Sequence, residues 1–91
     1  MTLQLLGRVW RLLWVKKLGR NTAGECESPD TPKKAIRILK DLEPEDELRL
    51  VLHECLHACA WWLDEEWIDR ASRDLARVLW RLGWRKAENP K

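Results

Sequence analysis

The chain has 91 residues with 17 Lys/Arg and 15 Asp/Glu, and all of its aromatic residues are tryptophan, seven in total. This length fits one domain, residues 1–91, with a single modest core. So many large apolar side chains argue against a disordered chain. The absence of any run of about 20 apolar residues argues against a membrane-spanning helix.

Charge is distributed unevenly along the chain. Residues 1–40 carry nine Lys/Arg and three Asp/Glu, a net +6, whereas residues 41–91 carry eight and twelve, a net −4. A basic half is compatible with an anionic partner. No basic run is long enough to indicate a nucleic-acid site, so we expect a solvated surface of mixed charge and no nucleic-acid partner.

Helical and strand periodicities compete over residues 3–18. Gly7 disfavours a helix, and we predict a strand over residues 8–16. The same segment does not fit a signal peptide, because Arg8 and Arg11 interrupt its apolar run and no small-residue cleavage site follows. We therefore expect a cytoplasmic protein.

Residues 19–34 are rich in glycine, proline, asparagine and aspartate, which predicts a loop. Its length is typical of a functional segment that covers a site and, equally, of a plain surface loop. The next segment, AIRIL at residues 35–39, alternates apolar and polar side chains. This pattern predicts a short strand.

Two helices are predicted in the second half of the chain. The first begins at Pro44, followed by three acidic residues that favour the positive end of a helix, and runs to residue 61 or 62. After a short connection, Asp64 is the predicted N-cap of the second helix. That helix carries an apolar stripe at helical spacing and ends at Gly83. We expect residues 86–91 to fray.

The first predicted helix contains both histidines of the chain in the order His-Glu-x-x-His. His53 and His57 lie on one helix face, so both imidazoles can bind one metal ion, ideally zinc at about 2.0–2.1 Å. Glu54 lies one residue further round, where a general base takes a proton from a metal-activated water. The surrounding residues are apolar, and burying these polar groups without partners would be costly. The alternative is a buried helix whose histidines are satisfied by hydrogen bonds.

A catalytic zinc site has three protein ligands and one open position. Because the chain has no third histidine, the remaining ligand must be acidic. An antiparallel second helix would bring its first turn close to His57, which makes Glu65, Glu66 and Asp69 candidates. Glu65 is the first choice and Asp69 the second, because they share a face beside the apolar stripe. The alternative for each is a solvated first-turn acid.

The cysteines, Cys26, Cys55 and Cys59, are odd in number and irregularly spaced, which argues against a disulfide framework. Cys55 and Cys59 share a helix face roughly opposite that of the histidines. The thiols and imidazoles therefore cannot bind one ion together, and we expect buried thiols that act as small apolar side chains.

The His-Glu-x-x-His helix followed by an acidic residue resembles the zincin metallopeptidases of the gluzincin type. Residues 20–83 also resemble short SprT-like or ImmA-like metallopeptidases of bacteria and phages, in GECESPDTPKKAIRI, ELRLVLHECLHACAW and LDEEWIDRASRDLARVLWRLGW. The resemblance implies an α+β, minimal zincin-like fold, with a sheet of two or three strands, the motif helix and a second antiparallel helix. It implies His53, His57 and Glu65 as zinc ligands, Glu54 as general base and AIRIL as the edge strand that aligns substrate.

We therefore predict a zinc-dependent metallopeptidase that acts on a peptide or protein substrate. The chain lacks tyrosine and a spare histidine, and Arg70 or Arg73 is a candidate for holding negative charge on the scissile carbonyl. The main alternative is a non-enzymatic zinc-stabilised module that binds a protein through exposed tryptophans. Nucleic-acid binding through the basic half ranks below both. The sequence carries no signal for an oligomeric state.

Overall fold

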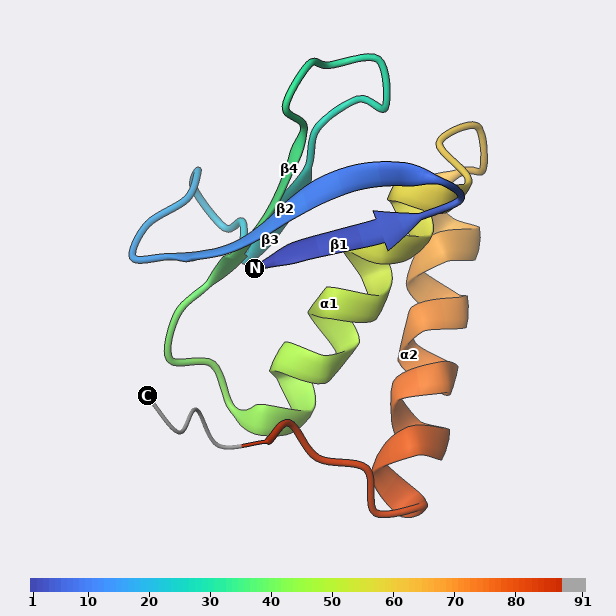
Figure 1. Cartoon of the computed structure of the whole chain (residues 1–91). Coiled ribbons are helices and arrows are strands. Elements are labelled where there is room, and N and C mark those ends of the chain that lie inside the picture. The colour runs from blue at the N-terminus through green and yellow to red at the C-terminus, as the bar shows by residue number, and fades with distance from the viewer. Residues whose placement is uncertain (88–91) are drawn as a thin grey trace.

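A computed structural model describes residues 1–87 and shows a four-stranded sheet with two helices on one side (Figure 1). The elements, in chain order, are β1 (Thr2–Leu5), β2 (Arg8–Val15), β3 (Gly24–Cys26), β4 (Ala35–Leu39), α1 (Pro44–Cys59) and α2 (Glu65–Arg81). The predicted α+β class is confirmed. The predicted number of two or three strands is wrong.

The first additional strand, β1, forms an antiparallel hairpin with β2. The two residues between them, Leu6 and Gly7, both have positive φ angles, of 50° and 77°. Positive φ at both central positions is the geometry of a tight two-residue hairpin turn. Leucine is an unusual residue there, which explains why the sequence did not indicate a turn. The predicted strand over residues 8–16 corresponds to β2.

The second additional strand, β3, lies inside the segment predicted to be a loop. It has only three residues and pairs antiparallel with β4, Gly24 opposite Ile38 and Cys26 opposite Ile36. The strand order is β1-β2-β4-β3, with β2 and β4 parallel. AIRIL is therefore an interior strand, and its predicted role as an edge strand is wrong. The edge strand next to AIRIL is β3.

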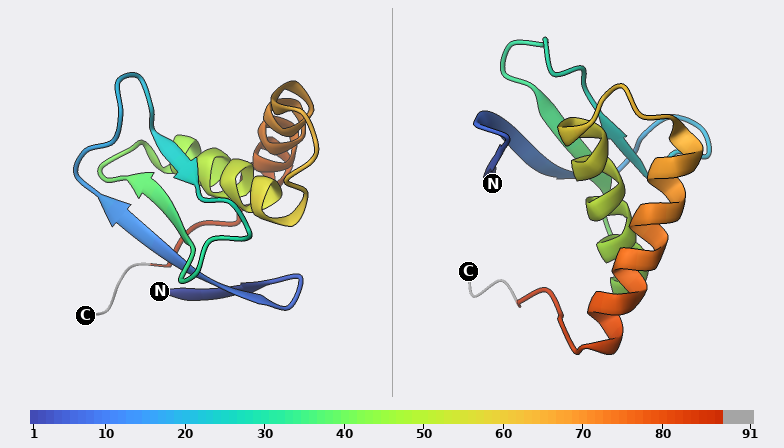
Figure 2. Two further views of the ribbon diagram at one scale, coloured as in Figure 1. Left: turned by 90° about the horizontal axis from the view of Figure 1, so that it is seen from above. Right: turned by 90° about the vertical axis from the view of Figure 1, so that its right-hand side faces the viewer.

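The core forms where α1 packs against the sheet. Its buried apolar members are Trp10, Leu12, Ile36, Ile38 and Ala58. The second helix, α2, packs on α1 through Ile68, Ser72 and Ala76 and lies on the side of α1 away from the sheet (Figure 2). The sheet therefore supports α1, and α1 in turn positions α2.

The three cysteines are free and half-buried, and Cys26 and Cys55 pack against the core. Burial raises the pKa of Cys26 to about 12 and that of Cys55 to about 11, with smaller contributions from neighbouring acids and thiols. Both thiols therefore stay protonated at neutral pH and are poor nucleophiles. The three free cysteines agree with the prediction of apolar thiols without a disulfide, although their side chains are less buried than expected.

The helix starts follow the local signals. Pro44 opens α1, and Glu45, Asp46 and Glu47 occupy its first turn. Asp64 caps α2 by accepting a hydrogen bond from the Trp67 backbone N–H at 2.8 Å. Both predicted starts are confirmed.

The helix ends differ more from the prediction. Helix α1 stops at Cys59, two or three residues earlier than expected, and a turn then leads into α2. Gly83 follows the end of α2 with a φ of 95°, as expected for a glycine that ends a helix.

Lys86, in the predicted frayed tail, forms an ion pair with Glu47 at 2.9 Å. Residues 88–91 of that tail lie outside the described residues. Neither helix of the described chain has the length and apolar character needed to cross a membrane.

Candidate metal centre

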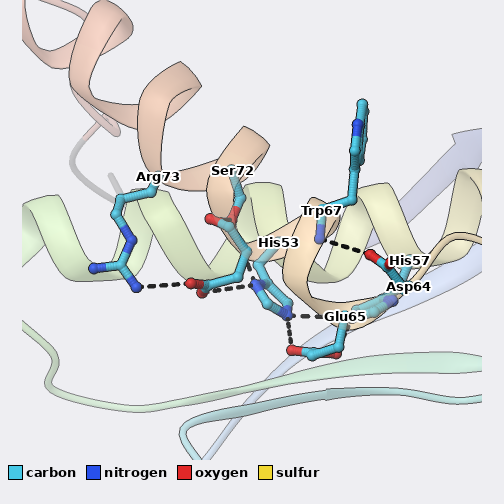
Figure 3. Close-up of polar contacts among 8 residues, drawn as sticks. His53, His57, Asp64, Glu65, Trp67, Ser72 and Arg73 are labelled. Atoms are coloured by element: carbon cyan, nitrogen blue, oxygen red, sulfur yellow. Dashed lines mark hydrogen bonds and ion pairs between the residues drawn. The ribbon is translucent and has the colours of Figure 1, made fainter.

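The C-terminal half of α1 and the first turn of α2 meet at a cluster of polar side chains (Figure 3). His53 and His57 lie one helical turn apart on the face of α1 that α2 approaches. Glu65 is the first residue of α2, and the Asp64 cap directly before it fixes where the helix begins. The short turn between the helices therefore brings Glu65 back to the level of the two imidazoles.

The donor atoms of these three residues face one another. The His53 Nε2 and His57 Nε2 atoms lie 3.2 Å apart, and the Glu65 carboxylate spans both, with Oε2 at 2.9 Å from His53 Nε2 and Oε1 at 2.8 Å from His57 Nε2. Two nitrogens bound to one tetrahedral zinc ion would lie about 3.3 Å apart. The imidazoles already match this separation, and Glu65 would need to move outward by about half an ångström. These three residues form the one group with metal-binding spacing found among the described residues.

The three residues of this group differ in exposure. His53 is buried, His57 is half-buried and the Glu65 side chain is 71% exposed. Burial lowers the pKa of His53. The neighbouring His57 lowers this pKa further, whereas Glu65 and Asp69 raise it. The neutral imidazole, which is the metal-binding form, is therefore favoured at His53. The exposed carboxylate leaves this side of the cluster open to solvent.

The structure places Asp69, the second-choice ligand, on the opposite side of the His53 ring. Its Oδ1 atom lies 3.8 Å from His53 Nδ1, and the Ser72 Oγ atom lies 3.4 Å from the same nitrogen. A hydrogen bond from Arg73, at 2.8 Å, lowers the pKa of Asp69 and keeps it ionised. The Ser72 hydroxyl is within hydrogen-bond distance of Nδ1 and the Asp69 carboxylate lies just beyond it, while Nε2 of the same ring faces His57 and Glu65.

Ser72 was missed by the sequence analysis. It is fully buried and lies between Ile68 and Ala76 at four-residue spacing, on the face of α2 that packs on α1. A small polar residue within an otherwise apolar stripe is the signal that could have identified it, because a buried hydroxyl requires a hydrogen-bond partner.

Glu54 is buried between α1 and the edge strand β3. Gly24 lies against this side chain, and a Cβ atom added there would lie 3.0 Å from Glu54 Oε2. Burial raises the pKa of Glu54 to about 7, and the negative charges of Glu65 and Glu25 add to the rise. The carboxylate predicted to be the general base is therefore shielded from water and lies within the electrostatic influence of Glu65. Gly24 was not identified from the sequence, because nothing local distinguishes it from the other turn glycines.

We expect Gly24→Ala to lower the free energy of unfolding by about 1 kcal/mol, because the new methyl group would crowd a buried side chain. The added Cβ would also lie 3.3 Å from Glu54 Cγ. Urea denaturation would measure the change. Gly19→Ala is the matched control, since its nearest neighbour, Thr22 Oγ1, is 3.7 Å away in ordinary contact. Equal stability of the two variants would contradict the close contact between β3 and Glu54.

The other acidic and basic candidates lie outside the group of three. The Glu66 side chain is 80% exposed and lies 3.9 Å from Arg70, which is itself exposed. Arg73 is bound to Asp69. Both arginines considered for a role on the substrate carbonyl therefore have carboxylate partners on α2.

Two imidazole nitrogens and the Glu65 carboxylate form a group that can hold a divalent cation. The second carboxylate, Glu54, is buried and can accept a proton. An ion at the centre would replace the hydrogen bonds that the three side chains now share. Comparisons of the chain with models of protein families, with curated proteins and with solved structures found no match.

Proposed function

We propose that the protein is a zinc-dependent peptidase with a minimal zincin-like arrangement, in which His53, His57 and Glu65 hold the metal and Glu54 is the general base. The convergence of three donor atoms within 4.8 Å of one another, beside a buried carboxylate, carries this proposal. Two imidazoles and one carboxylate form a ligand set suited to catalytic zinc. A purely structural site would usually have a fourth protein ligand and would not need Glu54.

When bound, zinc lowers the pKa of a water molecule to about 7 and polarises the carbonyl of the scissile peptide bond. Glu54 takes a proton from the attacking water and delivers it to the leaving amine nitrogen. Its burial against β3 fixes the carboxylate and limits competing water. Asp69 and Ser72 act through His53 and hold its ring in the orientation that binds the metal.

The edge strand β3 is the element that we propose aligns the substrate, in place of AIRIL. It is paired only with β4 in the described sheet, and its first residue, Gly24, lies against Glu54. An extended peptide can add to such an edge through main-chain hydrogen bonds. A peptide paired with β3 would pass directly beside the general base.

We expect the zinc-loaded protein to cleave an unfolded protein substrate, to lose this activity with a chelator and to regain it when zinc is restored. Activity should depend on the metal because, without the zinc ion, no group in the proposed site activates the attacking water. Hydrolysis of denatured, fluorescently labelled casein would measure the rate, with zinc content determined on the same samples. The absence of cleavage by protein that holds one zinc per chain, on casein and on a mixed peptide library, would contradict the proposal.

A second candidate, a zinc-stabilised protein-interaction module, is favoured by the exposed apolar surface. Trp62 is 79% exposed and Trp84 is 65% exposed. An apolar groove of about 820 Å³ lies between β1, β2, α1 and the segment after α2. Exposed apolar surfaces of this kind often bind proteins. A zinc-dependent rise in melting temperature without hydrolysis would favour this candidate.

A further inference from the structure

A cavity of about 570 Å³, open to solvent and separate from the candidate metal centre, lies between the start of β2 and the segment that connects β3 to β4 (residues 27–34). Its lining residues are Arg8, Val9, Arg11, Pro29, Lys33 and Lys34. Val9 and Arg11 are exposed and alternate with buried Trp10 and Leu12, so they point away from α1. Figure 1 shows the connecting segment as the loop that leads into the start of β4, and hydrogen bonds from Arg8 and Arg11 join this loop to the start of β2. The fold thus brings together two basic clusters far apart in sequence.

The cavity is strongly basic and its charges are not neutralised. Four of its six lining residues are Lys or Arg and none is acidic. None of the four forms an ion pair with a carboxylate within residues 1–87, whereas Arg37, Arg73 and Lys86 each have an acidic partner. Like charges this close repel one another, so a bound anion would relieve unfavourable electrostatic energy.

Of the two acids in the connecting segment, Asp30 forms no ion pair with the four cations within the described chain, and Glu27 is already engaged. Its carboxylate forms an ion pair with Arg37 at 2.8 Å and accepts a hydrogen bond from the Ala35 backbone N–H at 2.9 Å. The hydrogen bond from Arg37 is the main reason that the pKa of Glu27 is lowered, and the charge of Arg11 makes a smaller contribution. Glu27 therefore binds Arg37 and the Ala35 backbone beside the cavity and is not one of the residues that line it.

Backbone carbonyls hold the two arginines in place. The Arg8 Nη1 atom donates to the Pro29 carbonyl at 3.0 Å, and Arg11 donates to the Lys33 carbonyl from Nε at 3.1 Å and from Nη2 at 2.8 Å. A guanidinium has five N–H donors, so four remain on Arg8 and three on Arg11. Both side chains are positioned yet keep most of their donors for a ligand.

Lys33 adds a fixed backbone feature. Its φ angle of 52° lies in the left-handed region, which is uncommon for lysine. The two hydrogen bonds from Arg11 to its carbonyl, and a third from the Arg11 backbone N–H to the Lys34 carbonyl at 3.0 Å, hold the segment there. The cavity is thus organised before any ligand binds.

We propose that this cavity binds a small phosphoanion with two or more negative charges, such as a diphosphate or triphosphate group. Guanidinium groups match phosphate oxygens in pairs, and lysines supply compensating point charges. The volume is in the range of small-molecule sites. The four cations line a single open cavity and do not form an extended strip, which favours a compact anion over the backbone of a nucleic acid. The proposal does not depend on the peptidase activity.

Titration calorimetry with inorganic pyrophosphate tests the proposal on the 91-residue protein as purified, with zinc content measured before and after. We expect one pyrophosphate per chain, bound more tightly than orthophosphate and more weakly as salt is raised. Lys33→Gln should weaken binding by about three- to tenfold, and Arg8→Gln combined with it by more than about tenfold. The Lys33 side chain forms no hydrogen bond within the described chain, so this variant should keep its melting temperature.

Arg81→Gln is the matched control, because it removes one exposed positive charge from α2, outside the cavity. It should change the pyrophosphate affinity by less than about twofold, through net charge alone. Equal effects of Lys33→Gln and Arg81→Gln would overturn the proposal, as would the absence of saturable binding at low salt. Binding of single-stranded DNA or of phosphatidylglycerol vesicles without binding of pyrophosphate would also overturn it and would assign the surface to a polymer or a membrane.

Discussion

Replacing Glu54 with glutamine should reduce peptide hydrolysis by about 10²- to 10⁴-fold, the contribution of a positioned general base. Glutamine has nearly the same shape as glutamate, so it fits the space between α1 and Gly24, but its amide cannot take a proton from water. The three residues with metal-binding spacing are unchanged. The variant should therefore still hold one zinc per chain.

Casein hydrolysis and zinc content by mass spectrometry, measured on the same preparation, separate the loss of chemistry from the loss of metal. Glu66→Gln is the control, because it removes a negative charge from an exposed side chain in the first turn of α2, close in sequence to Glu65. It should retain the wild-type rate. Hydrolysis by Glu54→Gln at the wild-type rate would rule out Glu54 as the general base.

The second large effect is expected for His53→Ala, which should lose zinc binding. His53 contributes Nε2 to the cluster, and its Nδ1 atom faces Ser72 and Asp69. Mutation of residues that hydrogen-bond to metal ligands typically weakens metal affinity by about 10- to 100-fold. Removal of a ligand itself should weaken metal affinity further. The wild type should gain about 4 kcal/mol of stability at a zinc concentration of about 1,000 times the Kd. The variant should show no such gain in thermal denaturation.

Two further variants identify the third ligand. Glu65→Gln should lose zinc as His53→Ala does, whereas Asp69→Asn should keep one zinc per chain with about 10- to 100-fold weaker affinity. This difference follows from the positions of the two carboxylates, one at Nε2 and the other at Nδ1 of the same ring. Loss of zinc from Asp69→Asn together with full retention by Glu65→Gln would reverse the assignment.

Local sequence was sufficient wherever the relevant interactions span a few residues. Proline at the start of α1, Asp64 as the cap of α2 and Gly83 after its end depend on the backbone within one helical turn. The pairing of His53 with His57 has the same origin, because residues four apart on a helix must lie on one face. These features were predicted correctly because no distant part of the chain can change them.

The strands show the opposite case. The three residues of β3 are too few to carry a period, and they form a strand only because β4 supplies their hydrogen bonds. The alternation of AIRIL fits an edge strand and an interior strand equally well. It is an interior strand because it pairs with β2 on one side and with β3 on the other. The contact of Gly24 with Glu54 and the basic cavity beside Arg11 likewise join segments distant in the chain.

By itself, the sequence determined the α+β class, the two imidazoles on one helix face, the carboxylate beside them and, for a metal site, the need for an acidic third ligand. Only the tertiary structure showed that Glu65, and not Asp69, joins the two Nε2 atoms, because both acids lie on one face of α2 and local spacing cannot distinguish them. The length of the connection from Cys59 to Asp64 and the packing of α2 on α1 bring Glu65 to the Nε2 atoms and Asp69 to Nδ1. A helix face is a local property, whereas the point at which two helices meet depends on the packing of the whole domain.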